Sequence, residues 1–290
     1  MKTAIVTDTN SGISVDFAKK NKIYLINMPI IIDNQIFYEN KNINEDKFFD
    51  FIKNGKQIST SQPSINEITD KWDLILKNGY DELVYIPMSS ALSSSFESAK
   101  NLSLDYNGKV LVVDNHRISV TMLDSVLQAK SLADHGVSGV NIKKILENDA
   151  YNSSIYLAVN NLNFLKNGGR ISASAAFIGN FLSIKPILTI QGHKIEPFAK
   201  IRGNMKKCEI KMIDAIKNDL ETKFSKNDIS RLRIGAAGAG LNSDEIYEWL
   251  EILKNNFKSA EIYYSPLSAS ISCHTGLGAV GVGISFKYKF

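Results

Sequence analysis

Short runs of β-branched and aliphatic residues recur through the first half of the chain, and they constrain its fold more than any other feature. Four such runs read as buried strands: "TAIVTD" (3–8), "IYLINMPIII" (23–32), "ELVYIP" (82–87) and "KVLVVD" (109–114). Amphipathic stretches between and after them predict helices near 45–54, 65–77, 94–102 and 119–134. This order predicts a parallel sheet with helices on both faces, which binds ligands at the carboxyl ends of its strands.

The second half of the chain has a different pattern, typical of a mixed sheet with helices. "SIKPILTIQGHKIEPFAKIRG" (183–203) predicts a hairpin that turns at Gln191-Gly192, and a helix is expected over 205–220. Further strands are expected at "SIYLAV", "RLRIGAA", "AEIYYSPL" and "GAVGVGISFKYKF", with helices at "NLNFLKNGG" and near 243–256. The fold class is therefore α/β with two domains, a parallel-sheet domain (1–150) and a mixed-sheet domain (151–290). The segment of about 60–80 is a candidate for packing against the second domain.

Composition excludes several classes of function. The 290 residues carry a formal net charge of +4, and basic residues are not interleaved with aromatic ones over any long stretch, so a nucleic-acid partner is not expected. Cys208 and Cys273 lie far apart and lack metal-ligand spacing, so neither a metal nor a cofactor is expected. No signal peptide and no apolar run of roughly 18 residues is found, which predicts a cytoplasmic protein without a transmembrane segment. Transient contact with a membrane is left open.

Hydroxyl side chains crowd the stretch "QISTSQPSINE" (57–67). Ser64 and Glu67 have the spacing of a capping box, so part of the stretch is explained as the start of a helix. Thr60 and Ser61 precede that helix and are not explained by it. They are therefore candidate donors to a ligand.

A second hydroxyl cluster, "PMSSALSSSFESA" (87–99), follows a predicted strand and leads into a predicted helix. Free backbone N–H groups and the positive end of the helix dipole meet in such a loop, so it can bind a phosphate or a carboxylate. Ser93 supplies a side-chain donor there, and Ser94 has capping-box spacing to Glu97. The alternative is a serine-rich loop that only caps its helix. Other hydroxyls in this loop are Ser89 and Ser90.

Asp8 and Asp114 end two predicted strands of the same sheet, so both are expected at the rim that carries this loop. A structural role in holding the loops is favoured over ligand binding for both aspartates.

The glycine-rich stretch "TGLGAVG" (275–281) matches G-x-G-x-x-G, but the residues after it are strand-like, so a dinucleotide fold is excluded. Cys273 and His274 are neighbours in a segment expected to be extended and would point to opposite faces, which disfavours a thiol–imidazole pair. His274 can instead donate a hydrogen bond to an anion. Arg170 follows two glycines and Arg202 follows the hairpin. Either could pair with a carboxylate, a phosphate or a partner's acids, or could be an ordinary surface residue.

Several of these sequence stretches, taken in order along nearly the whole chain, resemble the DegV family of bacterial fatty-acid-binding proteins. The matching stretches begin with "VTDTNSGIS", "TSQPS" (60–64) and "SSALSSSFESA" (89–99). They continue with "VVDNHRIS", "LNFLKNGGRIS", "LSIKPIL", "KIRGNMKK" and "HTGLGAVG" (274–281).

The resemblance implies a two-domain α/β protein with a long-chain fatty acid buried between the domains. It implies that Thr60 and Ser93 hold the carboxylate and that His274 belongs to the same polar network. Ser61, Ser94, Thr275 and Gly276 are included as neighbouring candidates for ligand binding. It also implies a non-enzymatic carrier that presents the bound acid to a separate fatty-acid kinase, which forms an acyl phosphate. Arg170 and Arg202 are the matching candidates for the head-group region or for docking that kinase.

The sequence departs from the usual family pattern at Leu277, Ser94, Gly12 and Asn115, which leaves the three head-group residues in place. Two alternatives remain open. One is an enzyme that acts on a small phosphorylated ligand, with His274 or an aspartate as base. The other is a regulatory module that senses a lipid without handing it on.

Overall fold

The computed structural model describes residues 1–160, 162–171 and 184–289, and its first sheet is fully parallel. The strand order is β2-β1-β6-β7, with bounds β1 (Thr3–Asp8), β2 (Ile23–Ile26), β6 (Glu82–Ile86) and β7 (Val110–Val112). Alternate residues of β1 face opposite layers: Ala4 and Val6 pack toward one set of helices and Ile5 toward the other. The parallel sheet that the sequence predicts is confirmed.

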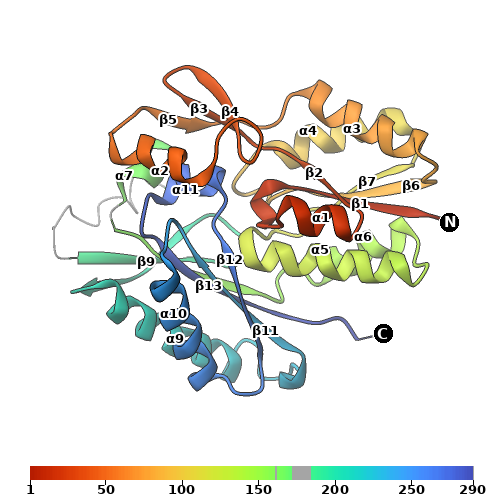
Figure 1. Cartoon of the computed structure of the whole chain (residues 1–290). Helices are drawn as coiled ribbons and strands as arrows, with labels where there is room; N and C mark the ends of the chain where they lie inside the picture. The colour runs from red at the N-terminus through yellow and green to blue at the C-terminus, as the bar shows by residue number, and fades with distance from the viewer. Residues whose placement is uncertain (161, 172–183, 290) are drawn as a thin grey trace.

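Helices cover both faces of this sheet (Figure 1). One layer holds α3 (Ile65–Lys77) and α4 (Ser95–Ser103), which bury Trp72 and Phe96 against the strands. The other holds α1 (Val15–Lys20), α5 (Ser119–Asp134) and α6 (Gly139–Asn148). Short 3-10 turns lie at η1 (Thr9–Ser11) and η2 (Leu104–Tyr106).

The second sheet is mixed and has the order β10-β9-β8-β13-β11-β12. Its strands are β8 (Ser154–Ala158), β9 (Ile184–Ile190), β10 (Glu196–Arg202), β11 (Leu232–Gly238), β12 (Glu261–Pro266) and β13 (Val280–Phe286). Among the described strands of this sheet, β11 and β12 form the one parallel pair. The hairpin predicted around Gln191-Gly192 is confirmed as antiparallel β9–β10. Helices α9 (Met205–Glu221) and α10 (Ser243–Asn256) cover one face, and η3 (Ile229–Arg231) precedes β11.

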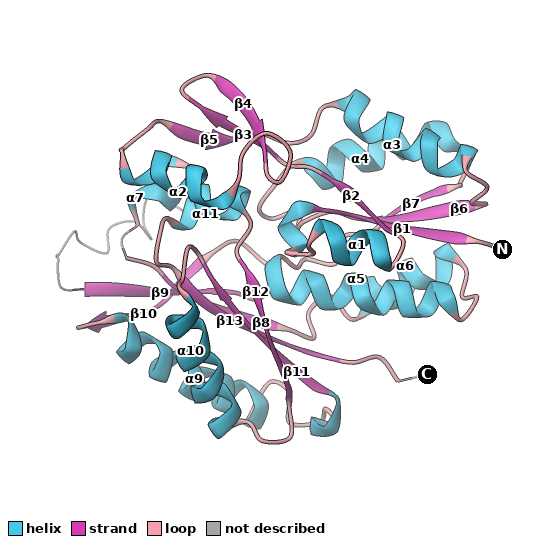
Figure 2. Cartoon of the chain, viewed as in Figure 1, coloured by secondary structure: helices cyan, strands magenta, loops and turns pink. Residues whose placement is uncertain are grey.

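The structure also contains a three-stranded antiparallel sheet (Figure 2). This third sheet was not predicted from the sequence. Its order is β4-β3-β5, with β3 (Pro29–Ile32), β4 (Gln35–Tyr38) and β5 (Ile58–Thr60), and α2 (Glu45–Lys53) lies between β4 and β5 in the chain. Strands β3 and β5 pack against α11 (Ala269–Thr275), which also contacts α7 (Asn163–Asn167).

Helix α5 joins the two larger sheets because it packs on both β1 and the pair β11 and β13. Its N-terminal half is buried on almost every side, as expected for a helix between two cores. The tyrosine hydroxyl of Tyr263 donates to Val120 O at 2.8 Å and fixes the start of the helix to the second sheet. The division into two domains at about residue 150 stays a prediction. That position falls between the end of α6 at Asn148 and the start of β8 at Ser154.

Several sequence-based expectations are wrong. The run 23–32 forms two strands in different sheets, because the chain breaks after Ile26 and restarts at Pro29. Strands β3 and β5, within 29–60, pack on α11 of the C-terminal half, whereas α3, which makes up most of the segment of about 60–80, packs on β2 and β6. Ser94 precedes α4 at the N-cap position, but its side chain makes no capping hydrogen bond. The residues around Cys273 and His274, expected to be extended, are helical over 269–275. Helices α1 and α6 were not predicted. Residues 161, 172, 182, 183 and 290 of the quoted stretches lie outside the described residues.

None of the described helices combines the length and the apolar character needed to cross a bilayer.

Candidate functional site

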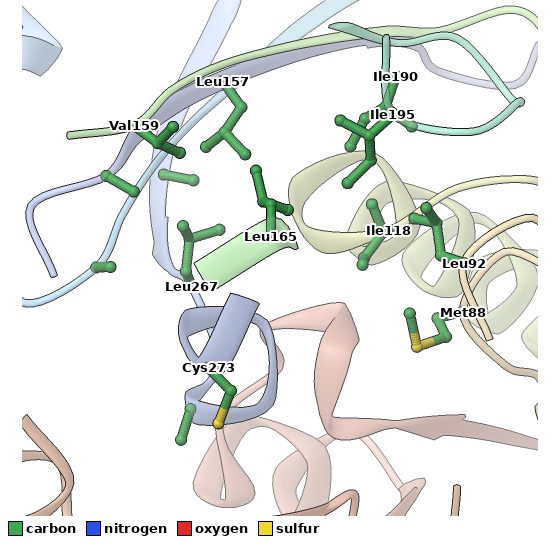
Figure 3. Close-up of a cluster of buried hydrophobic side chains, with 14 of the residues drawn as sticks. Met88, Leu92, Ile118, Leu157, Val159, Leu165, Ile190, Ile195, Leu267 and Cys273 are labelled. Carbon is green, nitrogen blue, oxygen red and sulfur yellow. The ribbon is translucent and has the colours of Figure 1, made fainter. Parts of the chain in front are cut away.

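A largely aliphatic cavity lies between the second sheet, the start of α5 and helix α11. It contains about 820 Å³ of empty space, including its open mouth. The cavity wall draws on strands β8, β9, β11 and β13, which are distant in the sequence. Figure 3 shows several aliphatic side chains of the cavity wall pointing toward one another. They include Leu92, Ile118, Leu157, Leu165, Ile190 and Ile195. A wall of this kind suits a hydrocarbon chain.

Polar side chains gather in the cavity wall near α11. Thr60 is the last residue of β5, and His274 lies in the last turn of α11. Thr60 Oγ1 and His274 Nε2 are hydrogen-bonded at 2.8 Å, although 214 positions separate them in the chain. The capping box predicted at Ser64 and Glu67 is confirmed and starts α3 just beyond Thr60. The polar residues Ser61, Ser93, Arg170 and Thr275 also line the cavity.

The imidazole of His274 is held in its neutral form. Burial lowers its pKa to about 4, and the nearby Arg170 guanidinium adds to that effect. Among the described residues its Nδ1 has no hydrogen-bond partner. Gly168 gives the ring its space, because a Cβ built there would lie 2.1 Å from Nδ1. A neutral histidine beside hydroxyls can offer a hydrogen bond without adding a buried charge.

Arg170 is fixed by backbone carbonyls at the edge of this cluster. Its Nε donates to Leu92 O at 3.3 Å and its Nη1 donates to Gly168 O at 2.6 Å. These bonds tie the loop before α4 to the turn that follows α7. The guanidinium therefore places positive charge near the polar end of the cavity.

The loop that carries Ser93 is held by the two rim aspartates. Asp8 Oδ2 accepts from Met88 N at 2.9 Å, and Asp114 Oδ1 accepts from Ser90 N at 3.3 Å. Burial raises the pKa of Asp8 to about 6, against the lowering effect of its backbone hydrogen bonds. Ser93 Oγ lies 2.8 Å from Ser95 Oγ and accepts from Ser95 N at 3.2 Å. The structural role favoured for both aspartates fits these bonds.

The structure brings some sequence-based candidates together and separates others. Thr60, Ser61, Ser93, Arg170, His274 and Thr275 line the cavity. Ser94 and Gly276 do not line it. Gly276 ends α11 at φ +74°, where its missing Cβ leaves space for the Phe164 ring. Arg202 is exposed at the end of β10, away from the cavity wall.

Cys273 is not part of a thiol–imidazole pair. It lies one position before His274 on a helix, not in the extended segment expected from the sequence. Burial raises the pKa of its thiol well above the usual range, so the thiolate needed for nucleophilic chemistry is disfavoured.

Sequence reasoning missed the cavity wall and three of its polar residues. Asn10, Ser119 and Ser270 line the cavity but were not predicted to bind a ligand, although Asn10 and Ser119 lie in stretches quoted for the family resemblance. The aliphatic wall residues read as ordinary core residues, because a strand that faces a cavity has the same period-two pattern as one that faces a packed core. Within the described part of the chain, no group of three or more His, Cys, Asp or Glu residues is arranged to hold a metal ion.

Comparisons with known proteins agree with this architecture. The family model described as "Uncharacterised protein, DegV family" matches residues 2–287. A DegV domain-containing protein of Staphylococcus aureus is 29% identical over 290 residues, with 99% of each chain covered.

Two solved structures are similar over 99% of this chain and 100% of their own. One is a fatty-acid-binding DegV family protein from Thermus thermophilus, with a TM-score of 0.87 and 26% identity. The other is DegV from Bacillus subtilis, described as a fatty acid binding protein, with a TM-score of 0.83 and 28% identity.

Proposed function

The chain belongs to the DegV family, and from that membership and the cavity we propose that it binds a long-chain fatty acid. The carboxylate lies at the end formed by Thr60, Ser93 and His274, and the tail lies among the aliphatic side chains of the cavity. The observation that carries this proposal is that neutral hydrogen-bond donors and aliphatic side chains line the same cavity. Fatty-acid binding by the two solved relatives supports the choice of ligand.

The tail supplies most of the affinity in this proposal. Each buried methylene contributes about 0.8 kcal/mol, so a chain of about fifteen contributes roughly 12 kcal/mol before the costs of binding. A hydrogen bond to a charged group adds about 1.5–3 kcal/mol. The donors therefore orient the acid, and the cavity wall selects a ligand with a long hydrocarbon chain.

The polar end suits an ionised carboxylate. Thr60 and His274 share one hydrogen bond, so this pair has one donor left for the carboxylate, either the Thr60 hydroxyl or the Nδ1–H of neutral His274, and the Ser93 hydroxyl can supply another. None of these donors brings a charge that has to be desolvated before the ligand enters. Arg170 adds attraction for the anion from a position fixed by Leu92 O and Gly168 O.

Mass spectrometry of an organic extract from the purified protein tests the proposal first. We expect a near-stoichiometric fatty acid, and titration of delipidated protein with palmitate gives its affinity. A protein that carries no fatty acid and takes up none when palmitate or stearate is added would rule the proposal out.

The finer proposal is that the bound acid is presented to a separate kinase, which forms the acyl phosphate. Arg202 is suited to docking because it is exposed and does not line the cavity. Arg202→Ala should bind palmitate as the wild type does but yield less acyl phosphate with the fatty-acid kinase of the same organism. Wild-type production by this variant would exclude the role for Arg202. A lipid sensor would bind palmitate equally well and give no acyl phosphate at all.

A further inference from the structure

The cavity has a second polar feature, at the first turn of α5. Ile118, Ser119 and Val120 all line the cavity, so this 16-residue helix begins at its wall. Ser119 is only 6% exposed, and its Oγ has no hydrogen-bond partner among the described residues. A buried hydroxyl without a partner is costly, and such groups are rare in folded proteins.

The first turn of α5 also lacks a cap. The residue before it, Ile118, has no side chain that accepts a hydrogen bond, and the turn contains no acidic residue. Within the described residues, no acceptor is found for the backbone N–H groups of Ser119, Val120 and Thr121. The nearby carbonyls are occupied: Thr121 Oγ1 donates to Ile118 O and Tyr263 donates to Val120 O. What the turn offers is therefore a set of donors at the positive end of a helix dipole.

The donors of this turn belong to α5, whereas Thr60 and His274 belong to β5 and α11. A plain hydrocarbon tail would leave the donors of this turn without a partner. An oxygen atom on the chain would accept a hydrogen bond there.

We propose that the first turn of α5, with Ser119, is a subsite for an oxygen substituent on the acyl chain, so that the protein prefers hydroxy fatty acids over plain ones. This inference rests on the proposed function and names the ligand class more closely. The ligand hydroxyl accepts from the Ser119 hydroxyl or from an amide of the turn. Ser119 is then a residue that determines specificity and leaves the carboxylate to Thr60 and Ser93.

The test compares stearic acid with hydroxystearic acids that carry the hydroxyl at successive carbons, by calorimetric titration of delipidated protein. One hydroxyl position should bind about tenfold more tightly than stearate, as one added hydrogen bond predicts. Ser119→Ala should abolish that preference and leave stearate binding unchanged or slightly tighter. Ser119→Gly should do the same, and it suits the backbone because φ at Ser119 is +54°.

Ser93→Ala is the matched control, since it should weaken both kinds of ligand and leave their ratio unchanged. Equal affinity for stearate and every hydroxystearate in the wild type would overturn the inference while the proposed function stands. A preference that survives in both Ser119 variants would overturn it as well. Weaker stearate binding in these variants would place the carboxylate at α5 and refute the subsite. Failure of the wild type to bind any of these acids would instead refute the proposed function.

Discussion

Gly168→Ala tests whether the placement of the His274 ring governs binding. The Cβ of an alanine at 168 would lie 2.1 Å from Nδ1 and 2.7 Å from Cε1 of the ring, and 3.2 Å from Phe164 O. Ordinary carbon contacts are about 3.5–4.0 Å, so the ring has to move by more than about 1 Å. The 2.8 Å hydrogen bond between Nε2 and Thr60 Oγ1 does not survive such a displacement.

The expected loss of palmitate affinity follows from the hydrogen bonds that the displaced His274 ring no longer makes. The hydrogen-bonded pair of Thr60 and His274 has one donor left for the carboxylate, and that donor loses the partner that orients it. A lost hydrogen bond to a charged group costs about 1.5–3 kcal/mol, which corresponds to a roughly 10- to 150-fold higher Kd for palmitate. Calorimetric titration of delipidated protein measures that change, and thermal unfolding checks that the variant is folded.

Gly169→Ala is the control for a neighbouring glycine. Its Cβ would meet nothing within 4 Å, but φ there is +69°, so we expect a stability loss of about 1 kcal/mol without a change in Kd. Adding Gly168→Ala to a His274→Ala background should cost no further affinity, because both changes remove the same interaction. Wild-type palmitate binding by Gly168→Ala would refute the reasoning.

Three further predictions concern the cavity and its titrating groups. Gly281→Val should fold but bind palmitate poorly, because its Cβ fits at 3.5 Å from Leu157 Cδ1 and the branched side chain fills the cavity; unchanged titration would contradict this. Burial raises the pKa of Glu39 to about 7, so this carboxyl alone should lower stability as pH rises from about 4.5 to about 7, by at most about 1.4 kcal/mol per pH unit. Urea unfolding at several pH values should show that Glu39→Gln lacks this contribution, while the contributions of Asp8 and His274 are kept. The lowered pKa of His274 has the opposite effect on the pH dependence of stability. As pH falls from 6.5 toward about 4, the unfolded chain binds the proton first, so the folded state loses stability. His274→Gln should therefore remove a loss of stability on acidification, and a pH profile identical to the wild type's would exclude that.

Local signals in the sequence identified most of the elements that position the site. The capping box at Ser64 and Glu67 marks the start of α3, and glycine at 192 lies in the turn of the β9–β10 hairpin at φ +83°. These signals act over a few residues and need no knowledge of the rest of the fold. The same reasoning failed for Ser94, whose spacing to Glu97 suits a capping box although its side chain makes no cap. Spacing alone does not fix the rotamer.

The site itself depends on contacts that local patterns do not encode. Nothing in the spacing of Thr60 and His274 indicates that they meet, and only the family resemblance placed them in one network. The run 23–32 shows the limit most clearly. Its hydrophobicity is continuous, yet β2 and β3 belong to different sheets, and β3 packs on the helix that carries His274. Tertiary packing, not propensity, decides that division.

Helix α5 links the cavity wall to both of the larger sheets. The helix packs on β1 of one sheet and on β13 of the other, and its first turn forms part of the cavity wall. Further along it, Asp124 pairs with Arg233 Nε at 2.8 Å and accepts from Ser285, so the same helix is bonded to the second sheet beyond the cavity. A tail that fills the cavity packs against the start of α5 and adds contacts only in the docked arrangement of the two sheets. Because a ligand that binds only the folded state stabilises it by RT ln(1 + [L]/Kd), a ligand concentration of about 100 times Kd adds about 2.7 kcal/mol to the free energy of unfolding.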